Sequence, residues 1–205
     1  MPQPRRIDRS AIVAVATDLL DERGLDGVSL HAIADRLGVQ QPALYHHVDS
    51  KAALLAAVAA DILDRRHTDR LPRPDETWDR FVMRNARSLR RALLSVRDGA
   101  RLITSTGARA PRLENAIAQV DLLERHGFDG EEAVMALIAI SRYVIGAVLE
   151  EQATRDRDAF LEAPDPADPR ASHLLDLTRR VSSLGADAEF EVGLIALVRG
   201  LDPAG

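Results

Sequence analysis

The sequence predicts an all-α fold in which a small N-terminal three-helix unit is joined to a larger helical core. Apolar residues recur three and four residues apart along almost the whole 205-residue chain, which is typical of amphipathic helices. No segment shows the strict alternation that is typical of a strand. The hydrophobic fraction of 46% is ample for a packed core, and Leu, Ala, Val and Ile must fill it because aromatic residues make up only 3%.

Four helices are expected before the first proline-rich break. Ser10 and Ser29 are placed to cap the first and second helices, and Asp49-Ser50 precedes the fourth. Gly38 ends the second helix. The four helices are expected at about residues 10–23, 29–37, 40–47 and 51–66.

Six further helices are expected beyond the break at Pro72 and Pro74. Pro111 is expected in the first turn of one of them, and Asp129 with Glu132 resembles a capping box for the longest. The stretch 154–170 contains three prolines and predicts a mobile loop. The six helices are expected at about residues 76–96, 99–105, 111–126, 130–152, 171–183 and 187–200.

The composition limits the class of protein. The chain has no cysteine, which excludes disulfides and thiolate metal sites. The N-terminus lacks an apolar signal core, and the longest apolar run, 133–149, is shorter than the roughly 20 residues of a membrane span. We therefore expect a soluble, cytoplasmic protein with no membrane partner.

Sequence motifs and charge give two negative results. The chain contains none of the motifs G-x-x-x-x-G-K, H-E-x-x-H, S-x-x-K and G-x-S-x-G, so an enzyme is not expected. The net charge is −5, and residues 1–51 hold six Arg or Lys against seven Asp or Glu. A nucleic-acid interface therefore has to be argued from local pattern rather than from a basic patch.

Three residues in the N-terminal unit have the spacing of a helix-turn-helix. Ala34 is small enough for a close crossing of two helices, Gly38 tolerates a positive φ in the turn, and Leu44 can anchor the second helix. In this motif the second helix enters the major groove of DNA. A generic helix hairpin satisfies the same spacing, so the motif alone leaves both interpretations open.

Polar residues around the anchor favour DNA contact over a merely solvated surface. Gln can pair with adenine, Tyr and His can hold phosphate or base edges, and Lys51 opens the next helix where it can meet phosphate. Pro42 lies in a first turn, where no backbone N–H is needed. The expected DNA-binding residues are Ser29, His31, Gln40, Gln41, Pro42, Tyr45, His46, His47 and Lys51.

The segment 37–48 followed by Lys51 resembles the DNA-binding domain of the tetracycline-repressor (TetR) family. Segments 90–94, 97–100, 127–128 and 146–152 resemble the tetracycline-repressor branch of that family, so the resemblance covers roughly residues 8–155 and returns near 197–200. It implies a DNA-binding head at residues 1–51 and an effector-binding and dimerisation domain at residues 52–205.

The resemblance also implies a homodimer held by a four-helix bundle of the helices at 130–152 and 187–200. The residues agree with this, because Ala133–Leu149 is apolar nearly all round and needs partners on several sides. Gly193 permits a close approach between helices. A core helix of a monomer is the alternative.

Polar residues on apolar helix faces indicate an effector site. Asn85 and Gln119 each lie among apolar neighbours, where an unpaired amide would cost about 1–3 kcal/mol. A satisfied structural role is the alternative for each, but with His67 and Glu150 they match drug-contacting positions of the branch. The expected effector-binding residues are His67, Asn85, Leu89, Ile103, Thr106, Ala116, Gln119, Val134, Leu137, Ser141, Arg142 and Glu150.

Two positions depart from the branch, in which the drug binds with magnesium. Ile103 stands where the branch has a metal-ligand histidine, and Arg142 replaces another histidine near the metal. Thr106-Gly107-Ala108 replaces a Thr-Arg-Pro that helps to form the pocket. We therefore expect no metal and no cofactor, and an apolar or aromatic effector.

The expected function is that of a ligand-responsive transcriptional regulator, most simply a repressor that a small molecule releases from palindromic double-stranded operator DNA. By family analogy, the helix from Lys51 to His67 is the lever, and DNA and effector weaken each other's binding. The alternatives are a repressor of drug efflux that responds to magnesium-tetracycline, and a DNA-binding regulator without an effector.

Overall fold

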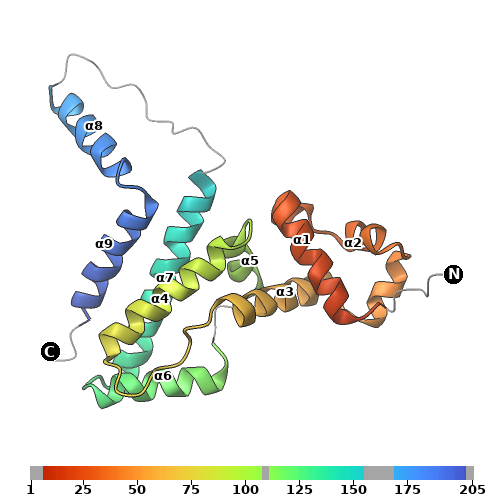
Figure 1. Ribbon diagram of the computed structural model, residues 1–205, viewed down its shortest axis with the longest axis horizontal. Helices are drawn as coiled ribbons and strands as arrows, with labels where there is room; N and C mark the ends of the chain where they lie inside the picture. Colours follow the sequence, from red (N-terminus) through yellow and green to blue (C-terminus); the bar gives the residue numbers. More distant parts are fainter. Residues whose placement is uncertain (1–6, 108–110, 155–168, 202–205) are drawn as a thin grey trace.

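The computed structural model describes residues 7–107, 111–154 and 169–201, and within them it contains helices and no strand. The expected all-α fold is confirmed. The N-terminal head consists of α1 (Arg9–Gly27), α2 (Leu30–Leu37) and the short 3₁₀ helix η1 (Gln41–His46). The next helix, α3 (Lys51–Arg66), leaves the head and runs into the core (Figure 1).

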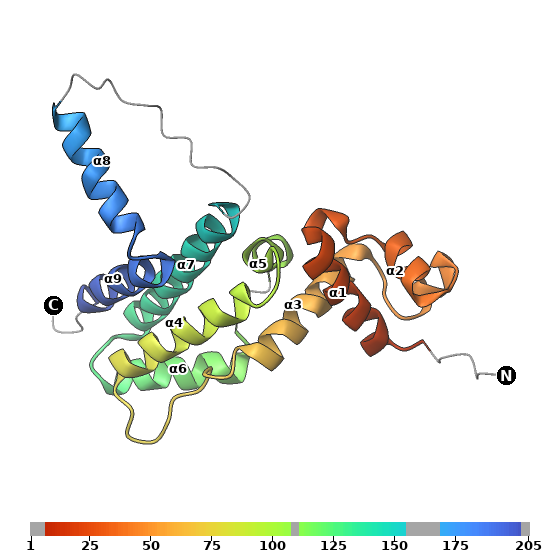
Figure 2. The same ribbon diagram turned by 45° about the horizontal axis from the view of Figure 1, so that its top comes forward.

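The core is built around one central helix, α4, which packs against α3, α5, α7 and α9. Helix α7 also contacts α5, α6 and α9. Helix α8 stands away from the rest of the core in both views (Figures 1 and 2), and none of its described side chains is buried. The core helices are α4 (Trp78–Leu94), α5 (Gly99–Thr106), α6 (Leu113–Arg125), α7 (Gly130–Thr154), α8 (Pro169–Ser182) and α9 (Ala186–Arg199).

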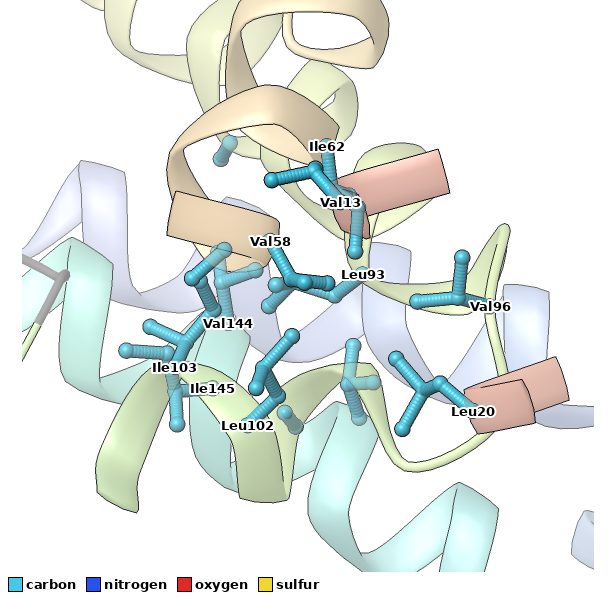
Figure 3. Packing of buried hydrophobic residues seen from close by; sticks show 14 of the residues in the cluster. Val13, Leu20, Val58, Ile62, Leu93, Val96, Leu102, Ile103, Val144 and Ile145 are labelled. Carbon is cyan, nitrogen blue, oxygen red and sulfur yellow. The ribbon is translucent and has the colours of Figure 1, made fainter. Parts of the chain in front are cut away.

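One continuous set of buried apolar side chains joins the head to the core (Figure 3). Leu20 of α1, Val58 of α3, Leu93 of α4, Leu102 of α5 and Val144 of α7 all belong to it. Full burial of such a side chain contributes about 1.5–3 kcal/mol. Helix α3 therefore packs against apolar side chains of both the head and the core.

The helix boundaries confirm several expected capping residues. The Ser29 and Ser50 hydroxyls accept hydrogen bonds from the backbone N–H groups of α2 and α3. Asp129 and Glu132 form the expected capping box, in which the Glu132 N–H donates to Asp129 over 2.7 Å and the Asp129 N–H donates to Glu132 over 3.2 Å.

Three expectations were wrong in detail. Asp8, not Ser10, caps α1, because its carboxylate accepts hydrogen bonds from both the Ala11 N–H and the Ser10 hydroxyl. Helix α1 also continues past Gly24, where it bends. Pro111 precedes α6 rather than lying in its first turn. The expected loop coincides largely with residues 155–168, which lie outside the described residues.

Helix α7 is longer than the apolar run 133–149 on which the expectation about a membrane span rested. By length and composition alone its 25 residues could cross a membrane, with a mean hydropathy of 1.8 over the most apolar 18-residue window, although the apolar run was expected to be too short. Only 33% of that window is buried in the subunit. The helix nevertheless packs against α4, α5, α6 and α9, as a core helix does.

Candidate functional site

The turn between α2 and η1 has the geometry that a helix-turn-helix requires. Gly38 adopts a left-handed conformation with φ 70°, which a residue with a side chain rarely adopts. The N–H of Val39 donates to the carbonyl of Ala34 over 3.0 Å and closes the end of α2. Ala34 and Leu44 are buried, so the crossing and the anchor lie where the sequence placed them.

The polar residues of η1 surround this anchor on the molecular surface. Tyr45 is 51% exposed although it is a large aromatic residue. Ser29 is partly used as the cap of α2, and His31 lies 3.4 Å from Asp35. Of the expected DNA-binding residues, Ser29, Gln41 and His47 are partly buried, and His31, Gln40, Pro42, Tyr45, His46 and Lys51 are exposed.

Two arginines near this surface were not singled out from the sequence. Arg23 and Arg36 line a surface hollow of about 500 Å³ together with His31. Arg36 is held by Glu22 through two hydrogen bonds of 2.9 and 2.6 Å. An arginine on the exposed side of a helix is too common in this chain for the sequence to mark these two.

Three of the expected effector residues meet at the connection between α3 and α4. The Asn85 amide donates to the carbonyl of Asp69 over 3.0 Å, and the Gln119 amide donates to the carbonyl of Arg70 over 2.8 Å. His67 Nδ1 lies 3.0 Å from the hydroxyl of Ser88. The structure thus brings side chains of α4 and α6 together around the segment 67–70.

Ser88 is a part of this cluster that the sequence did not reveal. It is fully buried, and its hydroxyl oxygen also accepts a hydrogen bond from the N–H of Asp69 over 3.2 Å. Burial and the nearby Arg70 lower the pKa of His67 from 6.5 to about 4. His67 is therefore neutral at physiological pH.

Ion pairs hold the same connection against α4. The Arg84 guanidinium pairs with Asp69 over 2.8 Å and with Glu76 over 2.6 Å, and all three side chains are largely buried. Arg84 holds the pKa of Glu76 below its usual value. The segment between α3 and α4 is thereby fixed from both ends.

The other expected effector residues are more scattered. Ile103 is buried, and the Thr106 hydroxyl donates to the carbonyl of Leu102 within its own helix. Leu89, Ala116, Leu137 and Ser141 are partly buried, whereas Val134, Arg142 and Glu150 are exposed. None of the expected effector residues lines the hollow of about 470 Å³ between α4 and α9, which is formed by Arg87, Arg90, Arg91, Leu94, Ser95, Asp187, Phe190 and Glu191.

The head is attached to the core where α1 bends. Gly24 has φ 71°, and this bend frees the N–H of Leu25 from the helix. The Asp98 carboxylate, at the start of α5, accepts that N–H over 2.8 Å. One turn earlier Asp21 accepts the N–H of Arg97 over 2.9 Å. Charged and backbone groups therefore tie α1 to the α4–α5 turn.

The exposed faces of α7 and α9 carry large apolar side chains. Val134, Met135 and Ile138 on α7 and Val192 on α9 are all exposed. The expected close approach at Gly193 occurs within the subunit, because a Cβ there would lie 2.2 Å from the hydroxyl oxygen of Tyr143 on α7.

Comparison with known proteins identifies the class to which this fold and surface belong. Residues 12–58 match the family model described as bacterial regulatory proteins, tetR family, and residues 71–204 match the tetracyclin repressor-like C-terminal domain. The chain therefore belongs to the tetR family.

Individual relatives are similar to this chain over nearly its whole length. The tetracycline repressor protein class A from transposon 1721 of Escherichia coli is 43% identical over 200 residues, which cover 96% of this chain and 91% of the relative. A TetR variant from Acinetobacter baumannii AYE, solved in complex with minocycline, superposes with a TM-score of 0.83 at 41% identity, covering 95% and 93% of the two chains. A BioQ structure with its double-stranded DNA operator gives a TM-score of 0.70 at 28% identity and covers 98% and 100%.

Proposed function

We propose that this chain is a homodimeric, ligand-responsive transcriptional repressor of the cytoplasm, released from its operator by a small molecule. The observation that carries the proposal is the exposed polar surface of η1, which follows the left-handed turn at Gly38 and is anchored by the buried Leu44. Membership of the tetR family and the operator complex of BioQ support the same function. Enzymatic activity is not proposed.

The head, residues 1–51, is proposed to bind DNA through the nine residues named from the sequence. Tyr45 is available for contact with a base or phosphate, because half of it is exposed. Lys51 at the start of α3 is proposed to contact phosphate. Each phosphate contact makes the affinity for DNA fall more steeply as the salt concentration rises.

The domain formed by residues 52–205 is proposed to bind the effector and to dimerise. His67, Asn85 and Gln119 are proposed as the polar contacts of the effector site. His67 belongs to the segment 67–70, and the amides of Asn85 and Gln119 donate to backbone carbonyls of that segment, so the three side chains lie together. The apolar faces of α7 and α9 are proposed to pair with those of a second copy. Effector binding would move α3, which starts at the DNA surface and ends at His67.

A response to magnesium-tetracycline is the second candidate. It is favoured by the 43% identity to a tetracycline repressor and by the minocycline complex of the Acinetobacter baumannii relative. Against it stands the buried Ile103, an apolar side chain at the position where, by the resemblance, the tetracycline-repressor branch has a metal-ligand histidine. A regulator without an effector is favoured only by the existing pairing of Asn85 and Gln119 with the backbone.

One binding assay tests these candidates. Duplexes selected from a random pool by the full-length protein supply the operator, and fluorescence anisotropy measures binding to it. We expect a palindromic site, about tenfold or greater weakening by Tyr45→Ala at constant fold, and no change with the control Arg199→Ala on α9. Absence of selected sequences would refute the DNA-binding function.

The same complex is then titrated with minocycline, with and without magnesium, and with a library of aromatic small molecules. Release by a library compound without magnesium supports the proposal. Release by minocycline only when magnesium is present would establish the second candidate instead.

A further inference from the structure

The hollow of about 470 Å³ between α4 and α9 lies outside the proposed effector site and is lined by three arginines. Arg87, Arg90 and Arg91 are three and four residues apart, so they share one face of α4. Leu94 and Phe190 add apolar walls to this charged surface. Sites for small organic ligands combine a volume of roughly 300–1,000 Å³ with apolar walls and a few polar groups, and the hollow has these properties.

Arg90 is the buried centre of this surface. It is only 8% exposed although it carries a permanent positive charge. Its two terminal nitrogens donate to Asp187 and Glu151 over 2.5 and 2.6 Å, and its guanidinium lies 4.8 Å from the centre of the Phe190 ring. Among the described residues, its Nε is the only fully buried side-chain nitrogen or oxygen without a hydrogen bond. Arg90 therefore has a donor that the described part of the protein does not use.

The two acids that pair with Arg90 differ in how firmly they are held. The Glu151 side chain is largely buried, whereas the Asp187 side chain is 90% exposed in the first turn of α9. Solvent screens the ion pair of an exposed carboxylate, so such a pair contributes little to stability. Asp187 can therefore turn into solvent and leave its place on Arg90 to another carboxylate.

The other two arginines determine how much negative charge the hollow accepts. Arg87 is paired with Glu191 over 2.6 Å, whereas the exposed Arg91 reaches Asp69 only over 3.4 Å. A ligand carboxylate that replaces Asp187 leaves the number of charges in the cluster unchanged. One negative charge on the ligand is therefore sufficient, and Arg91 is available as a second partner for it.

The hollow does not coincide with the apolar face of α9 that is proposed to pair with a second copy. Asp187, Phe190 and Glu191 are three and four residues apart, which places them on one face of the helix. Val192, on the proposed dimer face, follows Glu191 by one residue and therefore points about 100° away from it round the helix. The proposed pairing thus uses a different side of α9.

We propose that this hollow is a second ligand site, for a small organic acid that has one carboxylate and an apolar or aromatic body. The carboxylate takes the place of Asp187 on Arg90 and also pairs with Arg91. The body of the acid lies against Phe190 and Leu94. The site goes beyond the proposed function, because it shares no residue with the proposed DNA-binding surface or effector site.

NMR titration of the full-length protein with benzoate tests the proposal without DNA or effector. Benzamide has the same shape without the charge, and acetate has the charge without the ring. We expect benzoate to give saturable shifts of the side-chain N–H signals of Arg90 and Arg91, which are assigned by their loss in Arg90→Gln and Arg91→Gln. Benzamide and acetate should bind at least about tenfold more weakly. Absence of saturable shifts with benzoate would overturn the site, and equal binding of either analogue would overturn the proposed ligand class.

Three variants test how the carboxylate is bound. Asp187→Asn removes the competing charge but keeps the shape of the side chain, so it should tighten benzoate binding by up to about fivefold. Arg91→Gln should weaken binding by about threefold or more, and the matched control Arg80→Gln, at an exposed position of α4 outside the hollow, should leave it unchanged.

The opposite results would refute the proposed binding mode. Unchanged or weaker binding by Asp187→Asn would exclude an exchange of carboxylates on Arg90. Equal affinities of Arg91→Gln and Arg80→Gln would place benzoate outside the hollow. If Arg90→Gln does not fold, the titrations of Asp187→Asn and Arg91→Gln decide.

Discussion

The contact between Asp98 and the bent end of α1 allows a quantitative prediction about the junction of head and core. The Asp98 side chain is only 17% exposed, and its carboxylate accepts the N–H of Leu25 over 2.8 Å. Hydrogen bonds to a charged group contribute about 1.5–3 kcal/mol, and removal of the acceptor leaves the N–H unpaired. We expect Asp98→Ala to lower the free energy of unfolding by about 2–4 kcal/mol, including about 1 kcal/mol because alanine replaces aspartate at φ 57°.

Asp98→Asn separates these contributions, because asparagine tolerates the left-handed backbone and its carbonyl still accepts a hydrogen bond. It should cost about 1 kcal/mol, the difference between a charged and a neutral acceptor. Urea denaturation followed by circular dichroism at fixed protein concentration measures both variants. Arg101→Ala removes only an exposed partner of Asp98 and is expected to cost less than about 1 kcal/mol. A loss below about 0.5 kcal/mol in Asp98→Ala would refute the reasoning.

Three further predictions concern other parts of the molecule. Because the pKa of His67 is about 4 when folded and 6.5 when unfolded, only the unfolded chain takes up this proton between those values, so stability falls as pH drops from 6.5 to 4 by up to about 3 kcal/mol. Urea denaturation across this range should show the loss in the wild-type protein, and His67→Gln, which lacks the group, should lose about 3 kcal/mol less. Gly193→Ala places a Cβ against the Tyr143 hydroxyl and should lower both the melting temperature and, by about 1–3 kcal/mol, the free energy of unfolding. Adding Tyr143→Phe to this variant should restore part of the lost stability. Equal melting temperatures of Gly193→Ala and the wild-type protein would contradict the close contact. Ile138→Glu places a charge on the exposed face of α7 and should yield folded monomers in sedimentation experiments, whereas Leu113→Glu on α6 should remain dimeric; a dimeric Ile138→Glu would exclude this face as the interface.

The local parts of the fold could be predicted from sequence because the groups that determine them are close together in the chain. Ser29 and Ser50 cap helices three residues ahead of the N–H groups that they accept, and Asp129 pairs with Glu132 over the same separation. The choice between Asp8 and Ser10 was harder, because both side chains can cap a helix and they bond to each other.

Contacts distant in sequence could not be predicted in the same way. The N–H of Leu25 that the bend at Gly24 frees is accepted by a residue 73 positions further along the chain, and nothing around Asp98 marks it as that acceptor. In the sequence Ser88 is an ordinary helical serine, and only the fold brings His67 and Asp69 of the segment after α3 against it. Asn85 and Gln119 were recognised as buried amides in need of partners, but their partners are backbone carbonyls that carry no signature in the sequence.

The one-sided burial of α7 has a consequence for how much of the protein is active in a cell. Only 33% of its most apolar window is buried within one subunit, so in the proposed homodimer the second copy would cover part of the remaining apolar face. At low expression the concentration of dimer rises with the square of the subunit concentration. A doubling of gene dosage would then raise operator occupancy nearly fourfold in the dilute limit.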